Sequence, residues 1–216
     1  MRPRPRAAVA SVLVAAAVPS VTTPSRADDR DDAARDPTHG RIEGDATLVV
    51  AAGATFGPRD PRPTVGARMR YLSSAGIFAA YEDGSLFGGR AEPARVISVG
   101  GEWRPLFLGR WFLGKESGVG RVDLALDAVG LEVGAYVAQP QGRALESAPG
   151  LQLGVVLGVP LLPRASGPWI SARGGLRVGP SALEGAPPRG PADRALYLSL
   201  ELAWETVVLL HLVDRE

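Results

Sequence analysis

The sequence predicts an all-β fold: an antiparallel up-and-down transmembrane β-barrel of about eight strands. Three observations lead to this prediction. An export signal opens the chain, successive segments alternate apolar and polar residues, and runs rich in glycine, proline and charged residues separate those segments. The alternating segments match the ~9–11 tilted residues with which a strand crosses a bilayer. We therefore expect a signal peptide at 1–27, a disordered lead-in at 28–44 and a barrel domain at 45–213.

The N-terminal segment has the composition of a cleaved signal peptide. Arginines precede a short apolar run at 7–18, and Ser25 and Ala27 place small residues at a cleavage point. The run is shorter than the ~20 residues of a spanning helix, and an uncleaved disordered tail is the alternative. Residues 28–44 are charged and nearly free of large apolar side chains, so they cannot bury a core.

Composition excludes several classes of function. Removing residues 1–27 takes four of the 24 basic residues and none of the 23 acidic ones, which leaves a net charge of −3 and no basic excess for nucleic acid. The chain has no cysteine, so disulfides and thiolate metal sites are impossible. Its two histidines, His39 and His211, lie far apart in the sequence. We expect no metal site and no cofactor.

The clearest alternation lies at 195–208. Side chains in a strand point alternately to opposite faces, so this segment has one apolar face and one polar, charged face. The apolar face carries Leu196, Leu198, Leu200, Leu202, Trp204, Thr206 and Val208, and the opposite face carries Tyr197, Ser199, Glu201, Ala203 and Glu205. The same pattern predicts seven further strands at 46–56, 64–73, 77–83, 94–104, 119–138, 151–161 and 168–178.

The predicted strand at 119–138 is unusually long, and its alternation changes phase at 127–130. A one-residue bulge produces such a shift. A hairpin at the same place is the competing interpretation, but it would make the number of strands odd. Bacterial single-chain barrels have even numbers of strands, which favours the bulge.

The connections differ in length between the two ends of the predicted barrel. One end has the longer connections 57–63, 84–93, 139–150 and 179–194, and the other has the short turns 73–76 and 162–167. Long outer loops and short periplasmic turns are typical of outer-membrane barrels. The exception is 105–118, whose aromatic and basic residues indicate an interfacial segment at the membrane surface. A buried loop in a soluble domain is the alternative.

The inward face of the predicted strands carries charges of both signs. Ions in a narrow interior must be paired, and about eight strands leave only the space that side chains fill. We therefore expect a charge-paired, filled lumen rather than a general porin. The predicted network comprises Arg68, Arg70, Glu102, Arg104, Arg121, Asp123, Arg173, Arg177, Glu201 and Glu205, with Glu82, Asp127 and Glu132 on the same face.

Aromatic residues near strand ends and within 105–118 favour the membrane interpretation, because such residues form girdles at lipid–water interfaces. The expected interfacial aromatics are Tyr71, Trp103, Phe107, Trp111, Phe112 and Trp204. A soluble β-sandwich would show the same alternation with its charged face in water.

Three stretches carry a resemblance to a known family: R-Y-L-S-S-A-G-I-F-A-A-Y-E-D-G at 70–84, R-P-L-F-L-G-R-W at 104–111 and D-R-A-L-Y-L-S-L at 193–200. They resemble small outer-membrane β-barrel proteins of Gram-negative bacteria, in particular an exported barrel family from Arg-rich, Lys-poor proteomes. Lys115 is the single lysine of this chain. The resemblance implies a barrel in the outer membrane, in contact with membrane lipid, and implies no activity.

These features predict a non-enzymatic membrane protein that supports the envelope or binds through its outer loops. Loop arginines such as Arg189 and Arg194 could contact lipopolysaccharide phosphates, and Leu86 and Phe87 are candidate loop contacts. One alternative is a soluble, periplasmic, lipocalin-like carrier. Another is a lipid-modifying barrel enzyme, with His211 as base beside Glu205 or Asp214, although Ser199 lies a strand away from that histidine.

Overall fold

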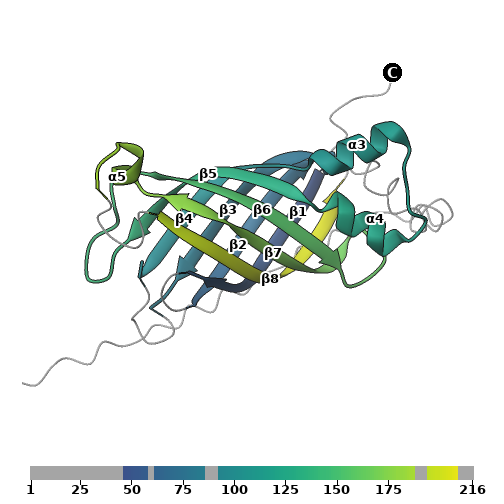
Figure 1. Ribbon diagram of the computed structural model, residues 1–216. Coiled ribbons are helices and arrows are strands. Elements are labelled where there is room, and N and C mark those ends of the chain that lie inside the picture. Colours follow the sequence, from purple (N-terminus) through teal and green to yellow (C-terminus); the bar gives the residue numbers. More distant parts are fainter. Residues whose placement is uncertain (1–45, 58–60, 86–91, 188–193, 209–216) are drawn as a thin grey trace, which may run out of the picture.

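The chain forms a closed barrel of eight strands. The computed structural model describes residues 46–57, 61–85, 92–187 and 194–208. Each strand pairs antiparallel with the next, and β1 pairs with β8 to close the ring (Figure 1). The strands are β1 Ala46–Phe56, β2 Arg62–Tyr71, β3 Ala75–Asp83, β4 Arg95–Trp103, β5 Gly130–Gln139, β6 Gly150–Pro160, β7 Gly167–Val178 and β8 Arg194–Val208. The predicted fold class is confirmed.

Some predictions fall on parts of the chain outside the described residues. These are the signal peptide at 1–27, the lead-in at 28–44, His39, His211, Asp214, and the loop residues Leu86, Phe87 and Arg189.

The alternation of the sequence becomes an inside-out distribution of polarity. On β8, Leu198, Leu200 and Leu202 expose 47%, 48% and 61% of their surface, whereas Ser199 and Glu201 between them are at most 4% exposed. The same alternation runs along all eight strands. Because the apolar side chains face outward, the barrel has an apolar outer surface and encloses its charged side chains, as the sequence predicts.

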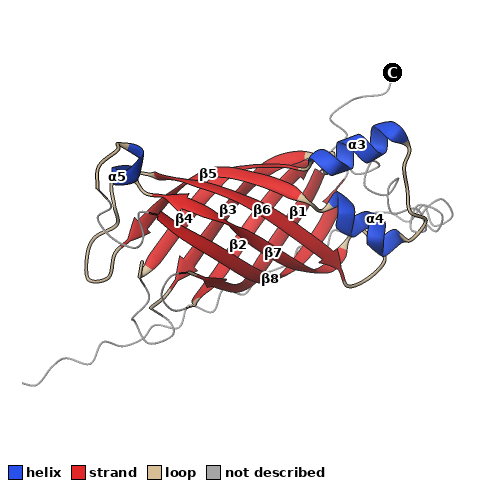
Figure 2. Cartoon of the chain, in the orientation of Figure 1, coloured by secondary structure: helices blue, strands red, loops and turns tan. Residues whose placement is uncertain are grey.

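In the described part of the chain, three helices lie in the connections between strands (Figure 2). Helices α3 (Pro105–Leu113) and α4 (Gly120–Asp127) both lie between β4 and β5, and the short α5 (Pro180–Leu183) lies between β7 and β8 at the opposite end. We call these the α4 end and the α5 end. Among the described residues, no helix has the length and apolarity needed to cross a membrane.

The predicted strand at 119–138 is wrong over its first half. Residues 120–127 form α4, and β5 begins only at Gly130, so the segment contains neither a bulge nor a hairpin. The apolar residues at 122, 124 and 126 fit a period of two, but residues four apart also share one face of a helix. Such a short run cannot distinguish the two periods.

The other strand boundaries move by only a few residues. β2 begins at Arg62 rather than 64, and β3 begins at Ala75 rather than 77. The turn between them is correspondingly tight: Leu72 and Ser73 have positive φ angles of 46° and 52°, and the Ser74 N–H donates to the Tyr71 carbonyl oxygen at 3.1 Å. This turn lies at the α4 end, where the sequence predicts short connections.

Helix α4 covers its end of the barrel with apolar side chains. Leu124 and Ala128, which follow one another four residues apart, are fully buried in one cluster with inward-facing Val49, Trp169 and Ala203. The indole N–H of Trp169 donates to the Ala165 carbonyl oxygen at 3.2 Å. The apolar cluster therefore joins the helical connection to the inner wall of β1, β7 and β8.

Candidate functional site

The barrel interior is the feature of this molecule that concentrates ionisable side chains. Alternation places eleven arginine and glutamate side chains on inward positions or directly at strand ends, and each residue is at most 5% exposed. They are the arginines Arg62, Arg68, Arg70, Arg104, Arg173 and Arg177 and the glutamates Glu82, Glu102, Glu132, Glu201 and Glu205. Their ion pairs arrange them in three layers along the barrel axis.

The first layer, which we call the outer layer, lies toward the α5 end and consists of Arg62, Glu82 and Arg177. Arg62 Nε lies 2.9 Å from Glu82 Oε2, and Arg177 Nη2 lies 2.5 Å from Glu82 Oε1. Arg177 Nε also donates to Gln152 Oε1 at 2.8 Å. One carboxylate thus serves two guanidinium groups.

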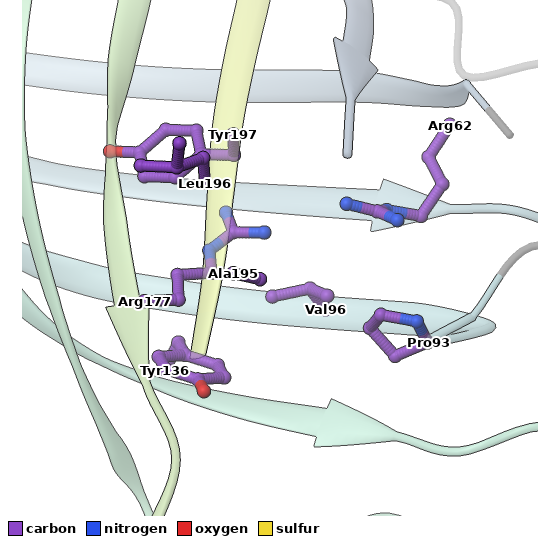
Figure 3. A pocket seen from close by; sticks show the side chains of 8 residues that line it. All are labelled: Arg62, Pro93, Val96, Tyr136, Arg177, Ala195, Leu196 and Tyr197. Atoms are coloured by element: carbon purple, nitrogen blue, oxygen red, sulfur yellow. The ribbon is translucent and has the colours of Figure 1, made fainter. Parts of the chain in front are cut away.

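Two tyrosine rings enclose the Arg177 guanidinium. Its central carbon lies 4.4 Å from the ring centre of Tyr197 and 5.6 Å from that of Tyr136 (Figure 3). Cations over aromatic faces at such distances are attracted by the ring quadrupole. The rings therefore fix the position of this arginine within the outer layer.

The middle layer consists of Arg68, Arg173, Glu132 and Glu201. Arg68 Nη2 donates to Glu201 Oε2 at 2.7 Å, and Arg173 lies 3.2 Å from Glu132 and 3.4 Å from Glu201. The Arg173 guanidinium also lies 5.4 Å from the ring centre of Phe78. Two arginines and two glutamates balance each other here.

The inner layer lies toward the α4 end and consists of Arg70, Arg104, Glu102 and Glu205. Arg70 Nη2 lies 2.6 Å from Glu205 Oε2, and Arg104 Nε lies 2.7 Å from Glu102 Oε1. Arg70 also lies 3.6 Å from Glu102, and Arg68 of the middle layer lies 3.9 Å from the same carboxylate. The layers thus join into one continuous network.

Eight of the ten lumen residues singled out from the sequence lie in this network, and Arg121 and Asp123 do not. Arg121 and Asp123 lie on α4, because residues 120–127 form a helix and not the predicted strand. Arg121 is exposed and donates to the Leu161 carbonyl oxygen at 3.2 Å. Asp123 is buried at the base of the helical connection and pairs with Arg110. Asp127 likewise pairs with Arg110, at 3.0 Å.

Asp123 organises the connection between α3 and α4. The backbone N–H of Ser117 donates to Asp123 Oδ1 at 2.8 Å, and the Arg110 guanidinium binds the same oxygen. Burial by itself would raise the pKa of Asp123, but the hydrogen bonds from Ser117 and Arg110 favour the charged form and hold the pKa below its ordinary value. The carboxylate therefore holds the two helices together while it is ionised.

Sequence reasoning missed Arg62. The inward positions of β2 run through Arg70, Arg68 and Thr64, so continuing the same alternation by two residues reaches Arg62. Prolines at 61 and 63 obscured the continuation, because proline is rare in strands. The sequence pattern therefore places Arg62 in the connection 57–63.

The predicted interfacial aromatics divide into two groups. Tyr71, Trp103 and Trp204 point outward near the α4 ends of their strands, and Trp111 and Phe112 are exposed on α3, where their rings lie 4.9 Å apart. Phe107 differs, because it is only 3% exposed. It lies on the buried face of α3, so the prediction that it meets the membrane interface is wrong.

A small cavity lies beside the outer layer. Its volume is about 10 Å³, and its lining includes Arg62, Arg177, Tyr136, Tyr197 and Val96 (Figure 3). In the figure the two guanidinium groups approach from opposite sides. Over the described ranges, no group of three or more histidine, cysteine, aspartate or glutamate side chains is placed to hold a metal ion.

These features define a class: small up-and-down β-barrels with an apolar outer wall and an ionic interior, as outer-membrane barrels have. No protein-family model matches the chain, and no curated protein sequence matches it.

Two solved structures align with most of the chain. Neisserial surface protein A (NspA) is 13% identical, with 74% of this chain and 94% of that chain covered and a TM-score of 0.36. Ail, the attachment invasion locus protein of Yersinia pestis, solved in complex with the heparin analogue sucrose octasulfate, is 11% identical, with 76% and 100% covered and a TM-score of 0.34. The assignment to the class follows from the strand order and burial of this chain itself.

Proposed function

We propose that this chain is a non-enzymatic outer-membrane β-barrel of small bore, whose charge-paired lumen is closed and which acts structurally in the envelope or binds through its outer loops. The observation that carries the proposal is the polarity of the wall. Leucines and valines point outward on all sides while the ion pairs are enclosed. In water this arrangement would expose a large apolar surface, whereas in lipid it satisfies both faces.

The proposed orientation places the α5 end outside the cell. At the α4 end, the turns at 72–74 and 161–166 are short, and the third connection, 104–129, contains α3 and α4. At the α5 end, the connections 84–94, 140–149 and 179–193 are longer, and 57–61 is short. Outer-membrane barrels have short periplasmic turns and longer outer loops. The α4 end therefore faces the periplasm.

Helix α3 fits the periplasmic lipid–water interface. Trp111, Phe112 and Leu113 expose 46%, 76% and 68% of their surface, and Lys115 follows the helix. The outward aromatics Tyr71, Trp103 and Trp204 lie toward the same end of the barrel. Aromatic rings prefer this depth of a bilayer, and a basic residue beside them suits lipid phosphates.

The three layers and the apolar cluster of α4 support a closed lumen. Each layer reaches across the interior through ion pairs of 2.5–3.6 Å, and Leu124 and Ala128 are fully buried at the α4 end. An ion that crossed the barrel would have to displace these pairs. The proposal therefore excludes a general porin.

Exposed arginines at the α5 end suit an anionic outer surface. Arg95, Arg143 and Arg194 are all exposed there. Guanidinium groups bind phosphates through paired hydrogen bonds, so lipopolysaccharide phosphates are the proposed outer contact. Replacing Arg143 and Arg194 with Gln should weaken binding to vesicles containing lipopolysaccharide, with less effect on vesicles of zwitterionic lipid.

The enzyme alternative receives no support from the described part of its candidate triad. Ser199 is 1% exposed inside the barrel, where its hydroxyl lies 2.7 Å from that of Thr55, and Glu205 pairs with Arg70. Ser199 therefore faces the barrel interior, and Glu205 is engaged by an arginine of the inner layer. Mass spectrometry of lipid A from cells with the parent chain and with His211→Ala tests the alternative, since an acyl change confined to the parent would favour an enzyme.

Membrane fractionation and gel migration test the main proposal. The exported protein should pellet with outer membranes, require detergent for release and migrate differently before and after boiling. In planar bilayers it should give no steady conductance. Recovery in the soluble periplasmic fraction would instead favour the carrier alternative, and a stable open channel would contradict the closed lumen.

A further inference from the structure

The three interior layers differ in their charge. The middle layer has two arginines and two glutamates, and so does the inner layer. The outer layer has Arg62 and Arg177 but only one carboxylate, Glu82. The next polar side chain in that layer, Gln152, is neutral. With all groups ionised, the described residues of the three layers therefore carry one excess positive charge, and it lies in the outer layer.

A buried charge without a counter-charge is costly. Arg62 and Arg177 are 1% and 3% exposed, so solvent screens them poorly. Arg62 Nη1 is buried and has no hydrogen-bond partner among the described residues, although Arg62 Nε donates to Glu82 Oε2. As far as the described residues go, the site therefore has both an unbalanced charge and an unused donor.

The small cavity lies at the same place. Its volume of about 10 Å³ is close to that of one water-sized particle, and both arginines line it (Figure 3). Apolar side chains and the two tyrosines provide the rest of its wall, with Pro93, Val96, Ala195 and Leu196 as the apolar residues. This mixed lining suits a weakly hydrated ion better than a multivalent one, which would keep its water shell.

We propose that the cavity binds one chloride-sized monovalent anion between Arg62 and Arg177. The bound anion accepts from the free donor of Arg62 and neutralises the outer layer, so that all three layers are balanced. This site depends on the barrel interior and not on the membrane placement proposed above.

The anion should stabilise the folded protein, because it binds the folded cavity and not the unfolded chain. The test uses the full chain refolded in detergent micelles at constant ionic strength, with sodium chloride replaced stepwise by sodium gluconate. Chloride should raise the unfolding midpoint saturably by about 3 °C. Bromide should act like chloride, and sulfate should give no saturable increase.

Gln152→Glu is the decisive variant. It adds a carboxylate of the same shape beside Arg177 and removes the amide nitrogen of Gln152, which is buried without a hydrogen-bond partner among the described residues. The outer layer then becomes neutral with both arginines in place. The unfolding midpoint of the variant should no longer depend on chloride. In gluconate, this midpoint should be no lower than the midpoint of the parent in chloride.

Arg62→Gln should also lose the chloride dependence, whereas Arg95→Gln is the matched control at the same end and should keep it. The Arg95 side chain is 46% exposed, and its Nε lies 3.4 Å from Asp83 Oδ2. Crystals grown in bromide should show an anomalous peak within hydrogen-bond distance of Arg62 Nη1. The proposal would be overturned if chloride did not change the unfolding midpoint of the parent. This is the result expected if a carboxylate from an outer loop occupied the site in place of the anion. Undiminished chloride dependence in Gln152→Glu would overturn it as well.

Discussion

Arg177 and Glu82 form an ion pair of 2.5 Å across the full width of the barrel. Arg177 is on β7 and Glu82 on β3, four strands apart in a ring of eight, so the two side chains meet from opposite walls. Arg68 on β2 and Glu201 on β8 likewise bridge over β1. The interior charges thus act as struts between strands that share no backbone hydrogen bonds.

Removing one partner of the widest strut should destabilise the barrel strongly. Glu82→Gln leaves the guanidinium groups of Arg62 and Arg177 buried with no carboxylate in their layer. Loss of one partner from a buried pair costs about 3–5 kcal/mol, and urea unfolding in phospholipid vesicles measures the change in the free energy of unfolding. Arg95→Gln, which breaks only the exposed pair with Asp83, should cost less than about 1 kcal/mol. Equal losses for the two variants would contradict the role of the outer layer.

A charge on the outer wall should be costly only if that wall meets lipid. Leu200 lies midway along β8 and is 48% exposed. Leu200→Arg should lower the free energy of unfolding by about 2–4 kcal/mol in vesicles, because an arginine at the bilayer midplane loses its hydration. In water an exposed leucine tolerates this change. If the variant is as stable as the parent in vesicles, the apolar wall does not face the hydrocarbon.

Two adjacent glycines on β4 should respond differently to alanine. A Cβ at Gly100 would meet the Val133 carbonyl oxygen and lie 2.8 Å from Phe78 Cε1, whereas at Gly101 the nearest atom is 3.7 Å away. Gly100→Ala should therefore destabilise the barrel by about 1–3 kcal/mol through overpacking, and Gly101→Ala should stay within about 0.5 kcal/mol. Thermal loss of the folded gel band compares the two variants directly. Similar midpoints would mean that the interior tolerates the added methyl group.

Acid should loosen the connection between α3 and α4. The folded-state pKa of Asp123 is lowered, so its stabilising contribution is present above the unfolded value of about 4 and is lost as the pH falls through the lower, folded value. The amide resonance of Ser117, which donates to this carboxylate, should shift in that range. Asp123→Asn retains the acceptor oxygen and should show no such transition. A transition near neutral pH in the parent would contradict the assignment.

Much of this architecture follows from the period-two alternation, because that pattern fixes which side chains share a face. It predicts the number of strands, the outward leucines of β8 and eight of the lumen charges. It cannot specify which charges meet, since partners such as Glu82 and Arg177 come from opposite walls and are brought together only by ring closure. The predicted number of strands is correct although 119–127 does not form a strand, because that segment belongs to the connection between β4 and β5.

The helical connection shows where local pattern fails. Over α4 and its C-cap residue, the spacing of Leu124 and Ala128 fits a helix, while Val122, Leu124 and Leu126 fit a strand. Only the contact of Leu124 with the barrel interior decides between them, and that contact is tertiary. Phe107 was misplaced for the same reason, because its burial on α3 depends on how the helix packs rather than on its composition.

The struts that join opposite walls have a consequence for assembly. A partly built sheet that lacks β7 and β8 would hold Glu82 without Arg177 and Arg68 without Glu201. Because unpaired charges are costly away from water, the earlier strands should be stable in lipid only after the last two strands have paired with them. Folding and insertion should therefore be concerted, with no long-lived half-barrel. Shortened chains that end before β7 should be degraded rather than accumulate as smaller barrels.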